Sequence, residues 1–237
     1  MKKYLRLFTS ISIGLFLYSC SPIIYNDLDA NYKKAIIDAM YADEHEISNN
    51  LIVISPNNTY LQWQGEGENK RVLVTSWIKE DINYYSIGEM VELKSDEIWV
   101  TACPELQDWY AKNEKKVKDI DLRLEQLLGL PPKSGQTHFI EFWVKPSDMF
   151  RPTPDNEITD QTTNLQLAEN IDSTYKAWYQ GNILYSYYPL AYPWTRLGYT
   201  YDWGNKKSEV GLSEFVIRKN AEVIVNSVQT TAEYLKN

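Results

Sequence analysis

Residues 51–78 read LIVISPNNTYLQWQGEGENKRVLVTSWI. The turn signals SPNN and GEGEN separate three segments, because their proline, asparagine and glycine residues favour reversal of the chain. Leu61 and Trp63 lie on one face of the middle segment, as expected for a strand. Consecutive strands with short turns predict an antiparallel meander. The predicted strands are Leu51–Ile54, Thr59–Gln64 and Arg71–Ile78, and Glu89–Leu93 and Glu97–Ala102 complete the set.

The clearest helix follows Pro104 and is predicted over Glu105 to Leu128. Apolar residues recur there at steps of three and four, which makes one buried stripe along an amphipathic helix. The opposite face pairs acidic with basic residues at helical spacing, which is typical of a solvated surface. Gly129 and the pair Pro131-Pro132 end this helix. The stripe consists of Leu106, Trp109, Tyr110, Val117, Ile120, Leu124, Leu127 and Leu128.

The order of the remaining elements predicts the fold class. Helical spacing of apolar residues predicts helices over Asp29 to Ile47 and over Ser173 to Tyr187. His138 to Val144 is a predicted strand, and residues 153–168 are a predicted exposed loop. Because strands cluster rather than alternate with helices, we expect one α+β domain over residues 29–237. It should have a mostly antiparallel sheet, a long amphipathic helix and one or two further helices. The C-terminal region should form a hairpin of Gly211–Arg218 with Glu222–Val228 and one helical turn at Thr230–Leu235.

The first twenty residues have a pattern of their own. Basic residues at positions 2, 3 and 6 precede an apolar run from Leu7 to Leu17, and the run ends in LYSC at residues 17–20. Leu17 lies three residues before Cys20, and the small residue Ser19 lies immediately before the cysteine. Residues 1–20 resemble a bacterial lipoprotein signal peptide that ends in a lipobox.

This resemblance implies a location in the cell envelope. Cys20 would take a diacylglycerol thioether, residues 1–19 would be removed, and residues 20–28 would form a tether. The apolar run is too short to cross about 30 Å of hydrocarbon, which needs about 20 residues. An uncleaved N-terminal anchor with an incidental Cys20 is the alternative. Ser21 stands where Asp would signal retention, so the outer membrane, facing the periplasm, is expected in a cell with two membranes.

The charge of the mature chain limits its partners. Removing the three basic residues of the signal peptide from the 24 in the chain leaves 21 against 32 acidic residues, a net charge of −11. Nucleic acid is therefore excluded as a partner, because phosphate backbones are bound by clustered Lys and Arg. The same acidity predicts no broad contact with an anionic leaflet, so the lipid alone should hold the protein there.

The chain has few cysteine and histidine residues that could act in catalysis or metal binding. Once Cys20 is lipidated, Cys103 has no cysteine partner for a disulfide. Cys103 precedes Pro104 and can in principle pair with His138 as a nucleophile, but a buried small hydrophobe is the commoner role. His138 is expected to be a core histidine. His45 lies in a charged segment without a second histidine nearby, so no metal and no cofactor are expected.

A pair of carboxylates is the alternative catalytic chemistry, because glycosidases need two. Glu141 lies between Phe139 and Trp143 on one strand face, and partial desolvation would suit it to general acid catalysis. A Glu that is satisfied by an Arg on a neighbouring strand is the structural alternative. The candidate second members are Asp148, Asp155, Asp202 and Glu214.

The most unusual segment is YPWTRLGYTYDWGN at residues 192–205. Its aromatic faces can stack on sugar rings or peptide side chains, and Arg196 and Asp202 can fix polar groups of a ligand. The alternative is that these rings fill the core beneath an irregular loop. The candidate ligand-binding residues are Trp194, Arg196, Tyr199, Tyr201, Asp202 and Trp203.

These observations predict a non-enzymatic, lipid-anchored binding or structural protein of the cell envelope. A cell-wall component or an envelope protein is the expected partner. A hydrolase that acts on a glycan or peptide is the second hypothesis, with Glu141 and either Asp202 or Glu214 as the acid and base. A subunit of a larger envelope assembly is the third, and it would expose a contiguous apolar patch.

Overall fold

The sheet is built around two long neighbouring strands. The computed structural model describes residues 28–79, 82–94, 97–188 and 190–236. Strand β2 (Arg71–Ile78) pairs with β5 (His138–Val144) over seven consecutive residues, from Val72 opposite Val144 to Ile78 opposite His138. Both strands have the predicted bounds. β2 is largely buried on both faces, which explains its nearly continuous run of apolar and small residues.

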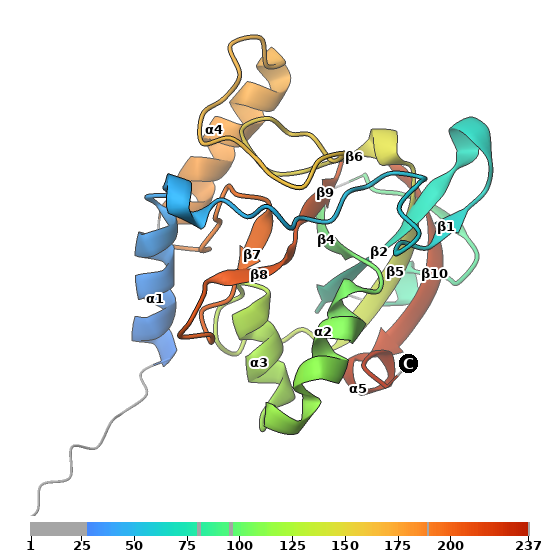
Figure 1. The fold of residues 1–237 in the computed structure, drawn as a ribbon. Helices are drawn as coiled ribbons and strands as arrows, with labels where there is room; N and C mark the ends of the chain where they lie inside the picture. The colour runs from blue at the N-terminus through green and yellow to red at the C-terminus, as the bar shows by residue number, and fades with distance from the viewer. Residues whose placement is uncertain (1–27, 80–81, 95–96, 189, 237) are drawn as a thin grey trace, which may run out of the picture.

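Eight strands form one mostly antiparallel sheet in the order β3-β10-β5-β2-β4-β9-β6, with β1 added beside β2. The α+β prediction is confirmed (Figure 1). The smaller β7–β8 pair is separate. The strand bounds are β1 Trp63–Gln64, β3 Met90–Glu92, β4 Ile98–Ala102, β6 Met149–Phe150, β7 Tyr199–Tyr201, β8 Val210–Ser213, β9 Phe215–Ile217 and β10 Glu222–Thr230.

Two local pairing predictions are wrong. Of the predicted meander only the antiparallel β1–β2 hairpin forms, and the rest is absent because β5 and β10 lie between β2 and β3. The C-terminal hairpin is also absent: β9 pairs with β4 and β6, and β10 pairs with β5 and β3. These apolar strands gain more stability by pairing with distant buried strands than by pairing with their neighbours in sequence. Short-range turn signals do not report that preference.

Leu51–Ile54 forms no strand. Its backbone instead bonds the 153–168 loop, with Leu51 N–H donating to Gln161 O at 3.0 Å and Ile54 N–H donating to Ile158 O at 2.7 Å. The loop itself has no helix or strand, as predicted.

The five helices of the described residues differ from prediction at two places. Helix α1 ends at Ala39 rather than Ile47, and a short 3-10 turn, Glu44–Glu46, follows it. The predicted long helix is two helices, because Asp119 caps a new one by accepting a hydrogen bond from Leu122 N–H at 3.1 Å. Helix α4 and the C-terminal turn α5 are confirmed. The bounds are α1 Leu28–Ala39, α2 Glu105–Asn113, α3 Ile120–Leu127, α4 Ser173–Tyr187 and α5 Thr231–Tyr234.

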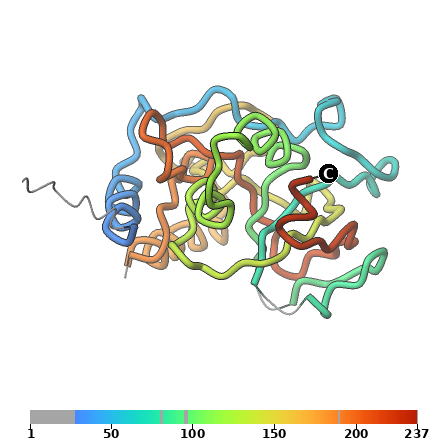
Figure 2. The backbone as a smooth tube through the Cα atoms, turned by 90° about the horizontal axis from the view of Figure 1, so that it is seen from below, coloured from blue at the N-terminus to red at the C-terminus, as the bar shows by residue number. Residues whose placement is uncertain are grey.

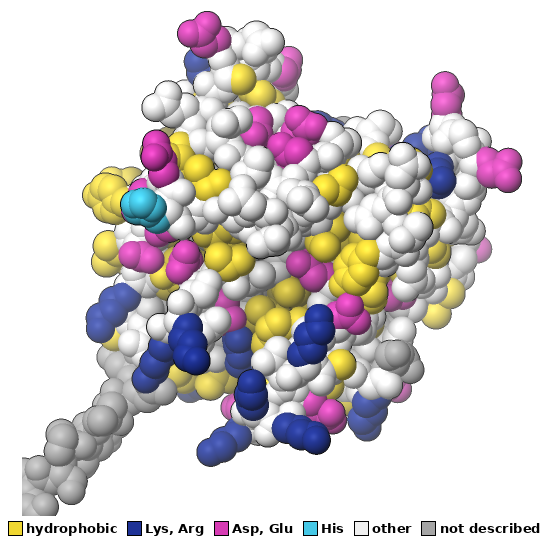
Figure 3. All heavy atoms as spheres, in the orientation of Figure 1, with side chains coloured by type: hydrophobic (Ala, Val, Ile, Leu, Met, Phe, Trp, Pro, Cys, Tyr) yellow, Lys and Arg dark blue, Asp and Glu magenta, His cyan; other side chains and the backbone are white. Residues whose placement is uncertain are grey.

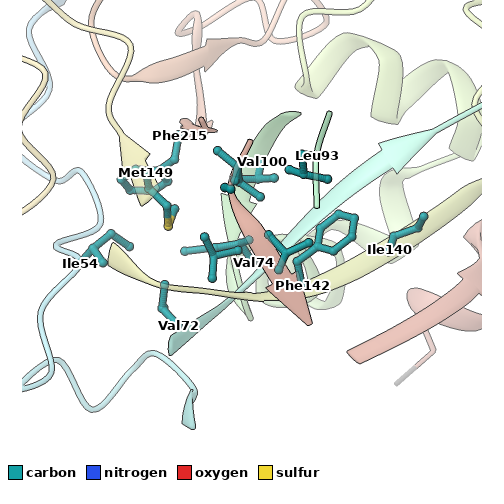
Figure 4. Packing of buried hydrophobic residues seen from close by; sticks show 14 of the residues in the cluster. Ile54, Val72, Val74, Leu93, Val100, Ile140, Phe142, Met149 and Phe215 are labelled. Carbon is teal, nitrogen blue, oxygen red and sulfur yellow. The ribbon is translucent and has the colours of Figure 1, made fainter. Parts of the chain in front are cut away.

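The main core cluster lies on one face of the sheet. Val72 and Val74 of β2 pack there beside Ile140 and Phe142 of β5 (Figure 4). Trp77 and Phe139 face the opposite side, where α2, α3 and α5 cover them. The break between α2 and α3 therefore lets both helices bury their apolar stripes on one cluster. That cluster contains Trp77, Leu106, Leu124, Leu127, Phe139, Leu212, Tyr234 and Leu235.

Helices α1 and α4 lie together at one side of the molecule (Figures 1 and 2). Tyr187 of α4 packs against Ile36 of α1, and its hydroxyl donates to Ala39 O at 3.0 Å. An aromatic cluster forms where α4 meets β9 and contains Tyr175, Trp178 and Trp194. No helix within the described ranges is both long and apolar enough to cross a bilayer.

Candidate functional site

A cleft opens where β2 and β4 separate. These strands pair only at Val74–Thr75 with Thr101–Ala102, and beyond that point β4 pairs with β9 instead. A cavity of about 330 Å³ lies in this region and is lined by both strands, from Thr75 to Ile78 and from Glu97 to Thr101. The cavity therefore follows from the change of strand partner.

An aromatic cavity of about 290 Å³ adjoins the first one. Asn182 and Ser186 of α4 contribute polar groups to its wall. The two cavities share Trp99, Leu128, Leu130, Tyr192 and Glu214, and we call them together the aromatic cleft. Their combined size suits a small ligand or part of a chain molecule. The aromatic side chains of the second cavity are Trp99, Tyr185, Tyr192, Trp194 and Tyr201.

Glu214 lies between β8 and β9 and lines both cavities. Its backbone N–H donates to Gly198 O at 2.9 Å, whereas its carboxyl receives no hydrogen bond and no cation from any described residue. Desolvation inside the cleft raises the pKa of this carboxyl to about 8, although the side chain is only partly buried and stays accessible from the cavities. The group is therefore protonated in neutral solution and can both donate and accept a hydrogen bond.

Polar groups of three lining residues also lack partners among the described residues. They are Asn182 Nδ2, Trp194 Nε1 and Gln136 Oε1, and all three are buried. Buried polar groups are nearly always hydrogen-bonded, so an unpaired set along one cleft indicates a place for water or a ligand.

The cleft holds no basic side chain among its described lining residues. Its other charged residue is Glu97, whose carboxylate accepts a hydrogen bond from Trp178 Nε1 at 2.7 Å. A site for phosphate, sulfate or another anion would need Lys, Arg or several backbone N–H groups. The cleft is therefore unsuited to an anionic ligand.

The aromatic loop 192–205 contributes only part of its predicted set to the cleft. Trp194 and Tyr201 line the aromatic cavity. Arg196 donates to Met40 O at 2.9 Å, and Tyr199 donates to Glu46 O at 2.8 Å. Trp203 donates to Leu130 O at 3.0 Å. These three side chains fasten the loop to its neighbours, so for them the structure corresponds to the alternative in which the loop packs as core.

Asp202 is also in a structural contact. It is 2 % exposed and forms a two-bond ion pair with Arg123 of α3, at 2.9 Å to Nη1 and 2.6 Å to Nη2. The guanidinium lies over the ring of Trp109 at 4.8 Å. This ion pair joins α3 to the loop that carries Trp194.

Asp202→Asn should destabilise the protein. The amide keeps the shape of the side chain but removes the charge opposite a half-buried guanidinium, so we expect a loss of about 2 kcal/mol in the free energy of unfolding. Urea denaturation followed by circular dichroism measures it. Asp119→Asn, at an exposed helix cap, should lose less, under about 0.5 kcal/mol, because Asn caps a helix as well as Asp and only a weak interaction with the helix dipole is lost. Equal stability of the Asp202 variant and the wild type would contradict this role.

The predicted carboxylate pair is not brought together in the cleft. Glu141 is buried beneath β10, where Oε2 accepts hydrogen bonds from Asn226 Nδ2 at 2.7 Å and from Ser227 Oγ at 2.8 Å. It lines neither cavity, and its hydrogen-bond partners among the described residues include no Arg. Asp155 binds the 153–164 loop through Thr153, Thr163 and Asn164. Of the predicted carboxylates, only Glu214 lines the cleft.

Glu97 was not predicted as a site residue. Its sequence signal is weak but readable: Glu97 and Trp99 alternate on the predicted strand and so share a face. Extending the register of β4 and β9 by one residue places Glu214 opposite Thr101, four residues from Glu97. Their backbone positions are therefore about 13 Å apart along the sheet.

Cys103 and His138 form no pair. Cys103 is fully buried, with its Sγ 3.8 Å from Glu141 Oε1 and 3.6 Å from the Tyr234 hydroxyl. Burial raises the pKa of this thiol well above its usual range, which disfavours a nucleophilic thiolate. His138 is half-buried at the start of β5 rather than in the core, and its Nδ1 lies 2.9 Å from Thr137 Oγ1.

The described part of the chain contains no group of three or more His, Cys, Asp or Glu side chains placed to hold a metal ion. Comparison of the chain with protein-family models, curated proteins and solved structures finds no match.

Proposed function

We propose that this protein is a lipid-anchored component of the bacterial envelope that binds a neutral, hydroxyl-rich ligand, a segment of glycan, in the aromatic cleft. The observation that carries the proposal is the Glu214 carboxyl, which lies unpaired at the junction of two cavities lined by aromatic rings. Such a group loses hydrogen bonds on burial and regains them when a ligand fills the cleft.

The chemistry of the cleft supports a sugar over other ligand classes. Sugar rings present apolar faces that pack on aromatic rings, and their hydroxyl groups both donate and accept hydrogen bonds. The protonated carboxyl of Glu214 matches that dual behaviour. Tyr192, at 37 % exposed, stacks on Tyr185 with ring centres 6.2 Å apart and offers a partly open aromatic surface. An anionic ligand would find no cation among the described lining residues.

The anchor is proposed from the sequence. Cys20 and the pattern before it lie outside the described residues, so the lipoprotein resemblance alone supports lipidation at this position. Metabolic labelling with palmitate should mark the wild-type product and not the Cys20→Ser variant. An unlabelled wild-type protein would overturn the anchor and leave the cleft proposal standing.

Tyr192→Ala should weaken glycan binding by about tenfold or more, equivalent to about 1.4 kcal/mol, because it removes a partly exposed wall of both cavities. The probes are oligosaccharides of β-1,4-linked N-acetylglucosamine, titrated into the full-length protein in detergent and followed by tryptophan fluorescence. Tyr41→Ala is the matched control, because Tyr41 is 77 % exposed and lines neither cavity. Saturable binding that Tyr192→Ala weakens and Tyr41→Ala preserves is the expected result.

Two outcomes of this titration would overturn the glycan assignment. Binding of none of the oligosaccharides would do so. So would saturable binding of tetramethylammonium without the sugars, because aromatic rings beside a carboxylate also attract cations.

One pair of carboxylates remains for the hydrolase hypothesis. The pair is Glu97 and Glu214, because both line the larger of the two cavities in the aromatic cleft. Working glycosidase carboxyls lie about 5–9.5 Å apart. Analysis of the titrated oligosaccharides for shortened products tests it directly. Products that disappear in both Glu97→Gln and Glu214→Gln would make the protein an enzyme rather than a binding protein.

A further inference from the structure

The charges of this acidic protein are unevenly distributed. The whole chain carries a net charge of −8. Figure 3 nevertheless shows Lys and Arg side chains gathered over the lower part of one face, whereas Asp and Glu side chains lie mainly in its upper part. In the view shared with Figure 1, the lower part lies over α1, α3 and the turn between α2 and α3.

Two segments supply most of this basic surface. The last turn of α2 and the turn to α3 carry exposed lysines at positions 112, 115, 116 and 118 against two exposed acidic residues, Glu114 and Asp119. The loop after β7 carries exposed Lys206 and Lys207 against Glu209. None of these six lysines forms an ion pair among the described residues. We call these six residues together with Lys34 of α1 the basic end.

The basic end lies where the chain enters the domain. Leu28, the first residue of α1, lines the same surface groove as Lys34, Lys206 and Lys207, and the acidic residues Asp38, Asp202 and Glu209 also line it. Figure 2, which views the molecule from below, shows α1 beside the loop that holds the last two. The eight residues from 21 to 28 span at most about 28 Å, so an anchor at Cys20 would keep this end near the membrane surface.

We infer that the basic end docks on anionic phospholipid headgroups of the leaflet that holds the lipid anchor. The inference rests on the anchor proposed above. Negative headgroups attract lysines only within about one Debye length, near 8 Å at physiological ionic strength. The tether is short enough to let the basic end reach that range, and attraction of its lysines to the headgroups would then hold it there. This distribution revises the expectation, drawn from net charge, that the protein would avoid an anionic surface.

The test uses the full-length lipidated protein in vesicles. One set contains phosphatidylcholine alone, and the other contains equal parts of phosphatidylcholine and phosphatidylglycerol. Acetylation of lysines, followed by mass spectrometry, should be slowed about threefold or more at Lys116, Lys206 and Lys207 on the anionic vesicles. High salt should remove the difference. Lys94 and Lys219, which are exposed near the β3 edge of the sheet, should react equally on both.

A charge-reversal pair gives the second measurement. Lys115→Glu with Lys116→Glu should abolish the protection at Lys206 and Lys207, whereas Lys94→Glu with Lys219→Glu should preserve it. Equal acetylation of the wild type on both vesicles would overturn the docking and leave the anchor intact, as expected if an acidic protein covers this end instead. Failure to float with either vesicle would overturn the anchor and this inference together.

Discussion

Arg151→Met should destabilise the protein by about 3–5 kcal/mol, the cost of breaking a buried charged network. The Arg151 side chain is fully buried, with 0 % of its surface exposed. Its guanidinium donates to the Asp160 carboxylate at 2.6 Å, to Asp160 O at 2.8 Å and to Ile52 O at 2.9 Å. Met fills a similar volume but satisfies none of these acceptors.

This arginine has an organising role for two segments without regular structure. Through it the irregular Leu51–Ile54 segment and the 153–168 loop are fastened to β6 and β9, where the guanidinium lies 5.6 Å from the Phe215 ring. Gly198 leaves room for its stem, because a Cβ at that glycine would lie 2.6 Å from Arg151 Cδ. Loss of the guanidinium should therefore release the two segments together.

Equilibrium urea denaturation gives the free energy, and hydrogen exchange at Leu51 and Ile54 locates the loss. Arg218→Met is the matched control, because Arg218 is exposed and lies 4.7 Å over the Phe150 ring. Its loss should cost less than about 1 kcal/mol. A change of under about 1 kcal/mol for Arg151→Met would mean that the network is dispensable.

The sequence pattern predicts well those elements whose signal is local. β2, β5 and α4 have their predicted bounds because each is an uninterrupted run that lies between turn, cap or proline signals. The break before Asp119 was missed because the apolar stripe resumes at Val117 and Ile120 with helical spacing, although it has no member between Tyr110 and Val117. Strand order was missed because pairing between β10 and β5 depends on burial of distant surfaces, which no turn residue encodes.

The candidate site also has one part that local sequence composition predicts and another part that depends on contacts between distant segments. The unusual composition of residues 192–205 correctly marks a region rich in buried rings, and Trp194 and Tyr201 do line the cleft. Composition cannot tell a ring that faces a cavity from one that fastens a loop, as Tyr199 does through Glu46 O. Glu97 and Trp99 join the site only because β4 changes partner from β2 to β9.

Glu214→Gln should remove part of the pH dependence of stability. The pKa of Glu214 is about 8 in the folded protein against 4.5 for a free side chain, so the folded state holds a proton that the unfolded state releases. Stability should therefore be highest below pH about 4.5 for this group, fall as the pH rises toward 8, and level off above it. A fully desolvated carboxyl would cost about 1.36 kcal/mol of stability for each pH unit between the two pKa values. Because the cavity admits water, we expect a smaller total loss, of about 2–3 kcal/mol.

The glutamine variant is the direct comparison, because it cannot ionise. It should match the wild type at pH 4 and exceed it in stability at pH 9, as measured by urea denaturation across that range. Glu105→Gln controls for buried carboxyls in general. Burial raises the pKa of Glu105 to about 7, but Ser213 N–H and Thr101 Oγ1 donate to its carboxyl, so its substitution should destabilise the protein at every pH. Parallel pH curves for wild type and Glu214→Gln would mean that the carboxyl is solvated, and the unpaired group on which the ligand proposal depends would be lost.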